Sequence, residues 1–197
     1  MTYQIYRYPA DLIDVTYLAG ERVVIRPVLP QDQELTRAFF GDLSPASRQQ
    51  RFLSAMRSLP PGLIERLTHV DYTSHLALVA EVFRDGRESV IAEARYAVGA
   101  DRSEAEFAIT VAEPWQGLGL ARLLLETLAR RAAVAGIRRL VGETLASNER
   151  MLKLARGAGF SITRSLSSRG LMRLQKTLAP PTADVPASGA AIAPAAA

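Results

Sequence analysis

Hydrophobic residues in the middle of the chain follow two different periods, one directly after the other. Residues 106–111 alternate between polar and apolar as a strand does, and a stripe with helical spacing of three and four follows. The stripe consists of Leu120, Leu123, Leu124, Leu128, Ala132 and Ala135. Gly117 and Gly119 lie between the two patterns. The chain is therefore predicted to run from a strand through a glycine turn into a long helix.

The same periods, with turn and capping residues, predict the other elements. Strands are expected over residues 22–28, 76–83, 89–96, 138–144, 161–164 and 171–176. Helices are expected over residues 32–40, 45–56, 63–67 and 148–157. Ser44 followed by Pro45 is a strong helix start, and Asp85-Gly86 is typical of a hairpin turn. Strands and helices thus alternate in the second half of the chain, which indicates an α/β fold.

Composition sets the number of domains. The chain has 197 residues, of which 48% are hydrophobic and 22% charged, as expected for one globular domain with a proper core. We assign residues 1–178 to that domain. From residue 179 to 197 the chain is dominated by Ala and Pro without any hydrophobic period, which predicts a disordered tail. Cysteine is absent, so a disulfide framework and a catalytic thiol are excluded.

Net charge, the N-terminal residues and the histidines bear on possible partners, localisation and metal binding. The net charge of +4 comes without any block of five like charges, so we expect no nucleic-acid partner. Residues 1–9 lack the features of a signal peptide, and no segment has the length of a membrane span. We therefore expect a cytoplasmic protein. His69 and His75 are isolated, and no metal site is predicted.

The glycine turn is the candidate binding site. With little side chain in the way, the N–H groups from Gly117 to Ala121 can point at one ligand, and the helix dipole adds partial positive charge. A phosphate or pyrophosphate is the expected ligand. Two other phosphate loops are excluded, because Arg122 stands where the dinucleotide fingerprint needs a third glycine and no Gly-Lys-Ser or Gly-Lys-Thr occurs.

Gln116, Gly119 and Ala121 form the pattern Gln-x-x-Gly-x-Ala, which resembles the acetyl-CoA loop of the GNAT N-acetyltransferases. The run from Asn148 to Gly159-Phe160 resembles the second signature of that family. The order of predicted elements is also similar to the GNAT fold. The resemblance implies a mixed, mostly antiparallel sheet of six to seven strands flanked by helices, with the fourth strand before the cofactor helix. It also implies acetyl-CoA as co-substrate.

A narrower likeness concerns the first part of the chain. This part of the chain resembles the acetyltransferase domain of bacterial Pat-type protein lysine acetyltransferases. The matching positions are Tyr8-Pro9, Gly20, residues 24–28, Asp32, Leu43-Ser44-Pro45 and Arg51-Phe52. This likeness implies a protein lysine as the acceptor amine. Acetylation of a small-molecule amine is the alternative.

The predicted reaction needs a base, because a lysine ammonium has a pKa of about 10.4 and must lose a proton before it can attack. Glu106 is the candidate catalytic residue: in a strand it shares a face with the small residues Ala108 and Thr110, and partial burial would raise its pKa. The position also resembles that of the GNAT catalytic glutamate. The alternative is an ordinary strand-end carboxylate. Weaker candidates for the base are Glu81, Glu93 and Glu113. Glu113 is a weaker candidate because it lies in the turn, where it would repel phosphates.

The resemblance further implies which residues bind the cofactor. These are Ile109, Thr110, Val111, Gln116, Gly117, Leu118, Gly119, Leu120, Ala121, Arg122 and Asn148. The backbone N–H around Val111 is the expected oxyanion donor. Asn148 is equally well explained as a helix N-cap. Trp115 is expected to anchor the turn by packing.

One departure from the family bears on mechanism. Many GNAT enzymes carry a tyrosine five residues before the closing phenylalanine, and here that position is Ala155. The general acid is therefore unassigned. The missing tyrosine leaves open a non-catalytic acetyl-CoA sensor as a second class of function. The sequence is compatible with a monomer or a homodimer.

Overall fold

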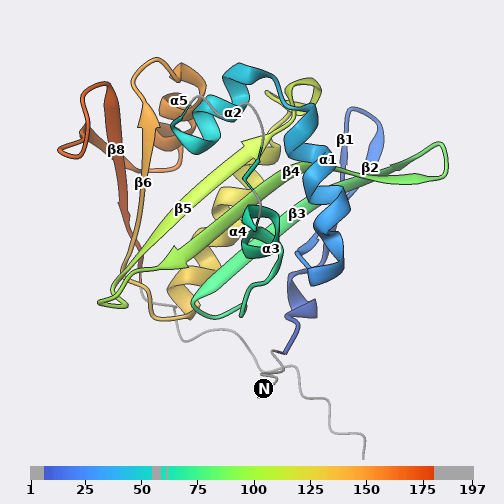
Figure 1. Ribbon diagram of the computed structural model, residues 1–197. Coiled ribbons are helices and arrows are strands. Elements are labelled where there is room, and N and C mark those ends of the chain that lie inside the picture. Colours follow the sequence, from blue (N-terminus) through green and yellow to red (C-terminus); the bar gives the residue numbers. More distant parts are fainter. Residues whose placement is uncertain (1–6, 55–58, 61, 180–197) are drawn as a thin grey trace, which may run out of the picture.

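The computed structural model of the chain describes residues 7–54, 59–60 and 62–179. Eight strands form one mixed sheet in the order β1-β2-β3-β4-β5-β6-β8-β7 (Figure 1). Their bounds are β1 Asp14–Leu18, β2 Glu21–Pro27, β3 His75–Arg84, β4 Arg87–Val98, β5 Glu104–Val111, β6 Arg139–Leu145, β7 Ser161–Arg164 and β8 Leu171–Thr177. All neighbouring strands are antiparallel except β5 and β6, which are parallel. The predicted tail lies outside the described residues apart from Ala179.

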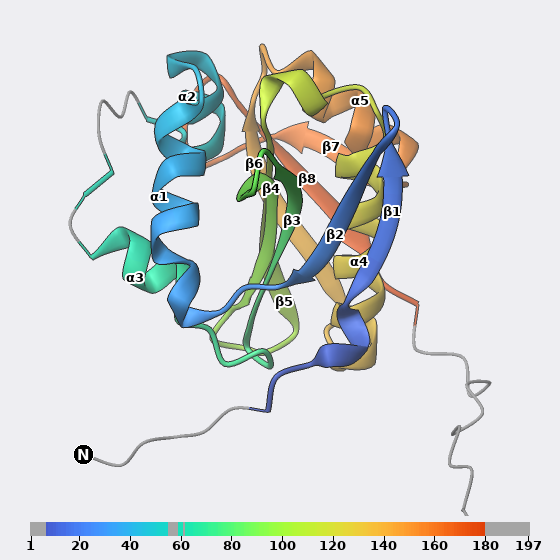
Figure 2. The same cartoon turned by 90° about the vertical axis from the view of Figure 1, so that its right-hand side faces the viewer.

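Helices cover both faces of this sheet (Figure 2). On one face lie α1 Gln33–Asp42, α2 Pro45–Phe52 and α3 Leu63–Thr68, and on the other lie α4 Leu120–Val134 and α5 Glu149–Gly157. Short 3₁₀ turns occur at Ala10–Leu12, Pro30–Asp32 and Glu113–Trp115. None of the helices in the described part of the chain is long and apolar enough to cross a bilayer.

The apolar stripe of α4 builds the larger of two cores. Its buried side chains are Leu120, Leu124, Leu125, Leu128 and Ala132. They pack with Tyr96 of β4 and Phe107 of β5. The predicted stripe is confirmed in its centre, whereas Ala135 is exposed beyond the end of the helix. The second core lies under α1 and α3, around Phe39 and Phe40.

The sheet has one strand more than predicted. β1 gave no clear apolar signal, because it lies at the edge of the sheet and exposes both Val15 and Tyr17. Its presence makes the strand before the glycine turn the fifth rather than the fourth.

The predicted caps and turns are confirmed, and one helix end differs. The Ser44 hydroxyl accepts a hydrogen bond from the Ser47 N–H at 3.1 Å, and Asp85 and Gly86 both have positive φ as the hairpin turn requires. The helix predicted to reach Met56 ends at Phe52, because Leu53 adopts the left-handed conformation. Met56 itself lies outside the described residues.

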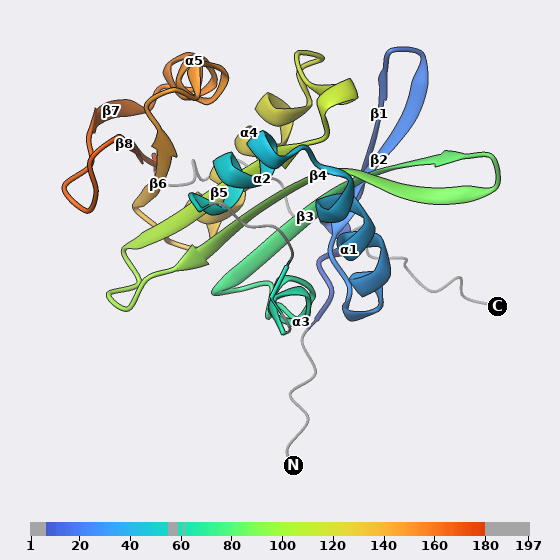
Figure 3. The same ribbon diagram turned by 45° about the horizontal axis from the view of Figure 1, so that its top comes forward.

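A split between β5 and β6 interrupts the sheet. Only the three pairs Glu104–Arg139, Ala105–Leu140 and Glu106–Val141 connect the two strands. Beyond them β6 diverges with β8 and β7 to form a separate wing beside β5 (Figure 3). Where the split opens, Gly142 lets Phe107 pack closely, since a Cβ at this glycine would lie 2.9 Å from the Phe107 ring. The fold therefore provides an opening between two parallel strands.

Candidate active site

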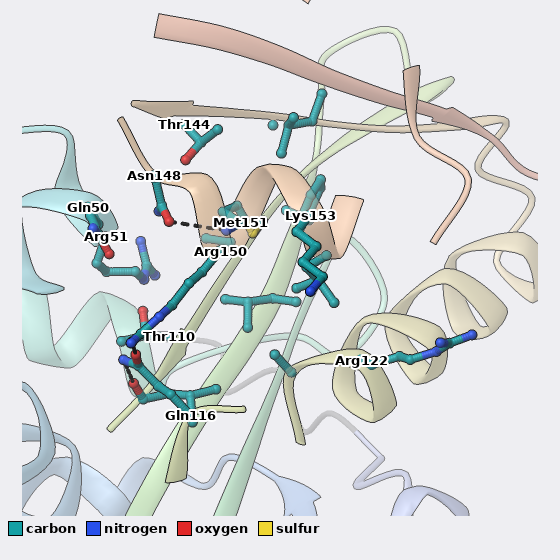
Figure 4. A pocket seen from close by; sticks show the side chains of 18 of the residues that line it. Gln50, Arg51, Thr110, Gln116, Arg122, Thr144, Asn148, Arg150, Met151 and Lys153 are labelled. Atoms are coloured by element: carbon teal, nitrogen blue, oxygen red, sulfur yellow. Dashed lines mark hydrogen bonds between the residues drawn. The ribbon is translucent and has the colours of Figure 1, made fainter. Parts of the chain in front are cut away.

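The split between β5 and β6 opens into a cleft of about 940 Å³. Residues from α2, β5, the glycine turn, β6 and α5 line it (Figure 4). A cleft of this size can enclose a large ligand. Of the helices that contribute to the cleft, α2 lies on one face of the sheet and α4 and α5 lie on the other (Figure 2).

The glycine turn lines one part of the cleft. Gly117 and Gly119 have φ values of 81° and 91°, a conformation that side chains rarely adopt. Gly119 is the N-cap of α4, and no side chain caps this helix within the described residues. The first N–H groups of α4 thus lack an intrahelical partner, as the predicted anion site requires.

Most of the predicted cofactor residues do come together. The cleft is lined by Ile109, Thr110, Val111, Gln116, Gly117, Gly119, Ala121, Arg122 and Asn148. Leu118 and Leu120 are not among the lining residues. The side chain of Leu120 lies in the core, and that of Leu118 is 40% exposed. Asn148 lines the cleft, and it is the predicted N-cap of α5, because its Oδ1 accepts from the Met151 N–H at 3.1 Å.

Three basic residues of α5 lie on the side of the cleft next to the glycine turn, and two of them, Arg150 and Lys153, were missed in the sequence. Arg150, Lys153 and Arg156 line the cleft together with Arg122 of α4. Their spacing of three residues places them on one helix face, and this signal was available in the sequence. The cluster makes this side of the cleft attractive to a polyanion.

Glu106 lines the cleft at the point where the strands separate. It belongs to the last β5–β6 pair, and its side chain is exposed rather than partly buried as predicted. Beyond this pair β6 no longer runs beside β5. Ala108 and Thr110 share its face and also line the cleft, as expected from the strand period.

Glu93, a weaker candidate for the base, is engaged in a buried ion-pair cluster. It is 2% exposed, and it pairs with Arg51 at 3.3 Å and with Arg95. Burial alone would raise the pKa of Glu93, but the two guanidinium groups hold it below its ordinary value. Glu93 is therefore ionised and already partnered. Arg51, which was not predicted as a site residue, carries this cluster to the wall of the cleft.

The two other alternative carboxylates are structural. Glu81 pairs with Arg26 at 2.7 Å. Glu113 accepts the Ser44 N–H at 3.1 Å, and so it points at the start of α2 rather than into the glycine turn. Burial opposes ionisation of Glu113, but hydrogen bonds from Ser44 and Ser47 lower its pKa to about 2. The predicted repulsion of phosphates by Glu113 is thus not supported.

The β6 wall contributes a further carboxylate that the sequence did not indicate. Glu143 lines the cleft and is half-buried. The Ser167 hydroxyl donates to its Oε1 at 2.8 Å, and the Ser165 hydroxyl donates to the same oxygen. No sequence signal marks Glu143, because the turn that holds it lies more than twenty residues further along the chain.

The remaining predicted residues have packing roles. Trp115 is 5% exposed beneath the guanidinium of Arg84, which lies 5.0 Å from the ring centroid, so the predicted anchor is confirmed. Ala155 is fully buried in the core. His69 donates or accepts only within α3, and no group of three His, Cys, Asp or Glu residues able to hold a metal occurs in the described ranges.

Comparison with known proteins identifies relatives of this domain. The family model described as acetyltransferase (GNAT) family matches residues 39–160. Acetyltransferase PA5475 of Pseudomonas aeruginosa is 36% identical over 141 residues, which cover 72% of this chain and 76% of that protein. Acetyltransferase Pat of Mycolicibacterium smegmatis is 34% identical over 143 residues, covering 72% of this chain but only 42% of the longer relative. The crystal structure of the GNAT domain of S. lividans PAT superposes with a TM-score of 0.78 at 32% identity, covering 87% of this chain and all of that domain.

Proposed function

The chain belongs to the acetyltransferase (GNAT) family, and on that premise we propose that it transfers an acetyl group from acetyl-CoA to a protein lysine, with Glu106 as the base. The observation that carries the proposal is the cleft at the β5–β6 split, which has an uncapped helix N-terminus and basic residues on one side and Glu106 on the other. Phosphates are attracted to the first side, and an ammonium group to the second.

Cofactor binding is supported by the backbone N–H groups of the glycine turn and by the basic side chains that line the cleft beside it. In the proposal, the N–H groups from Gly117 to Ala121 hold the pyrophosphate, while the basic residues of α5 hold the remaining phosphate. The pantetheine arm lies along residues 109–111 of β5. This edge of the strand has no strand partner beyond Glu106, so its backbone groups are available to the arm, apart from the Val111 carbonyl oxygen, which accepts from the Gln116 amide.

The chemical step begins with proton removal. In the proposal, Glu106 takes a proton from the entering ammonium, directly or through one water, and the neutral nitrogen attacks the thioester carbonyl carbon. The C–N bond forms, the nitrogen gives its second proton to water, the C–S bond breaks, and the CoA thiolate leaves. Because Ala155 is buried in the core, no side chain at this position reaches the sulfur, and water supplies the proton to the thiolate.

The direction of the backbone supports Val111 as the oxyanion donor. The N–H of Ala112 bonds to the Ile91 carbonyl oxygen of β4 at 2.9 Å. Successive N–H groups of a strand point to opposite edges, so the N–H of Val111 faces the split. A donor there meets the carbonyl oxygen of a thioester held between the strands.

The acceptor is proposed from the likeness to Pat. Its support is the relationship to acetyltransferase Pat of M. smegmatis, of which this chain spans less than half, and to the S. lividans PAT domain. The exposed position of Glu106 fits a long, flexible lysine side chain that enters from solvent. A small-molecule amine is the second acceptor class, and a non-catalytic acetyl-CoA sensor follows if no amine is acetylated.

Transfer of labelled acetyl from acetyl-CoA to the proteins of a cell extract tests this proposal, with Glu106→Gln run in parallel. We expect labelled lysines with the wild type and a loss of about 10²-fold or more in the variant, the range for removal of a general base. The affinity for acetyl-CoA should stay the same, and Glu88→Gln, an exposed carboxylate outside the cleft, is the charge-matched control. Tight binding of acetyl-CoA without any transfer would favour the sensor.

A further inference from the structure

Glu143 lies on the same face of the sheet as Glu106, but on the neighbouring strand β6. Val141 is the ladder partner of Glu106, and Glu143 follows two residues later on β6, so the strand period places both carboxylates on one face. Both line the cleft. The hydroxyl of Thr110, which also lies on this face, is buried and has no hydrogen-bond partner among the described residues. These groups are the polar side chains that an acceptor would meet on this face of the sheet.

The carboxylate of Glu143 is held only by neutral donors. Ser165 and Ser167 donate their hydroxyls to it, with distances of 2.8 and 3.0 Å from the Ser167 Oγ to the two carboxylate oxygens. Within the described ranges it makes no ion pair. Arg173 is its ladder partner on β8, yet the Arg173 guanidinium contacts Glu104 instead, at 3.5 Å.

Several other carboxylates of the sheet have a cationic partner. Glu81, Glu93 and Glu104 all pair with arginine. Serine hydroxyls satisfy lone pairs of Glu143 and fix its position, but they leave its negative charge uncompensated. A fixed carboxylate in a cleft without its own cation is suited to bind a cation from outside.

The serine turn links this carboxylate to the outer surface. Leu166 lies between the two serines that hold Glu143, and its side chain is fully exposed. The Ser165 hydroxyl lies 2.8 Å from that of Ser167, so both flanks of Leu166 are fixed against β6. Leu166 is not among the residues that line the cleft, so only an acceptor that extends beyond the cleft, such as a polypeptide, can contact it.

We propose that Glu143 binds the ammonium group of the acceptor and that the Ser165–Ser167 turn presents Leu166 to the polypeptide around it. The inference rests on the proposed transfer to a protein lysine and deepens it. Glu143 is an acceptor-binding residue, while Glu106 takes the proton. The two carboxylates stand on opposite walls of the split, one on β5 and one on β6, so that a lysine side chain enters between them.

Peptide binding to the CoA-loaded protein tests the role of Glu143. Isothermal titration calorimetry compares the blocked peptide Ala-Ala-Lys-Ala-Ala with its norleucine analogue, which lacks the ammonium group. We expect the wild type to prefer the lysine peptide and Glu143→Gln to reduce that preference about tenfold, as for loss of one charged hydrogen bond. Glutamine keeps oxygen and size for the serine hydroxyls, and Glu88→Gln controls for the change in net charge.

The outcomes separate this inference from the proposed function. If the wild type acetylates and prefers the lysine peptide but Glu143→Gln retains the full preference, only the role of Glu143 is wrong. If the preference depends on Glu143 but no acetyl is transferred, the inference stands and the transferase assignment falls. A wild type without any preference for lysine overturns both.

Leu166→Asp tests the second half of the proposal. We expect it to raise KM for the lysine peptide about fivefold and to raise KM for butylamine much less, because only the peptide reaches the turn. Thr163→Asp places the same charge on the exposed part of β7 and serves as the control. Equal effects of Leu166→Asp on both acceptors would contradict a role in polypeptide docking.

Discussion

Gln116 and Arg150 meet across the entrance of the cleft (Figure 4). The Arg150 guanidinium donates to the side-chain oxygen of Gln116, while the Gln116 amide donates to the Val111 carbonyl oxygen at 2.9 Å. The pair connects the end of β5 to the first turn of α5. It thereby fixes one basic residue of the cofactor side at the edge of the split.

Replacement of Arg150 by methionine is expected to weaken CoA binding about five- to tenfold, because one charged contact to a phosphate is lost. The loss of affinity caused by Arg150→Met should be smaller with dephospho-CoA, which lacks one phosphate. It should also be smaller at high salt concentration, because salt screens the contact between the guanidinium and the phosphate. Calorimetric titration with both ligands measures the difference. Arg130→Met, on the exposed side of α4, is the matched control, and an equal loss in that variant would contradict the assignment.

Replacement of Glu93 by glutamine is expected to destabilise the fold by roughly 3–5 kcal/mol, because Arg51 and Arg95 would remain buried without their counter-charge. The change in urea unfolding free energy measures this effect. Glu21→Gln breaks an exposed pair with Arg84 and should change stability little. A small effect of Glu93→Gln would show that the cluster is not required for the stability of the fold.

Glu113 should make the free energy of unfolding depend on pH in the acidic range. Its pKa in the folded protein is about 2, below the ordinary value of 4.5. The folded state therefore binds the proton less readily than the unfolded chain, and the stabilisation is fully present above pH 4.5 and is lost as pH falls toward 2. We expect the unfolding free energies of wild type and Glu113→Gln to differ at neutral pH and to converge in this window. Parallel curves down to pH 2 would contradict the role of Glu113 at the start of α2.

Gly142→Ala should disturb the point where the split opens. The added Cβ would lie 2.9 Å from the Phe107 ring and 3.2 Å from the Phe107 carbonyl oxygen, so β5 and β6 must move apart. We expect a loss of roughly 1–3 kcal/mol in stability together with weaker CoA binding. Gly41→Ala lies in α1 with open space around its Cβ and should be neutral or stabilising. Retention of both properties in Gly142→Ala would show that the strands tolerate a wider separation.

The local parts of the site could be predicted from the sequence. The strand, the turn with Gly117 and Gly119, and the start of α4 follow from residue spacing and backbone preference over some fifteen consecutive positions. The Asn148 cap and the exposure of one face of β5 are local in the same sense. Such features depend on neighbours in the chain, so a single sequence contains the information that specifies them.

What only the tertiary structure decided is which distant residues face one another. The alternation of polar and apolar residues in β5 and in β6 is visible in the sequence. The sequence does not show that the two strands separate after Glu106, or that Glu143 then lies on the opposite wall of the split. Likewise, Arg51 and Glu93 lie 42 residues apart, and their pairing depends on how α2 packs on the sheet. The physical reason is that strand pairing and burial depend on the whole core, whereas period, caps and turns depend on a few adjacent residues.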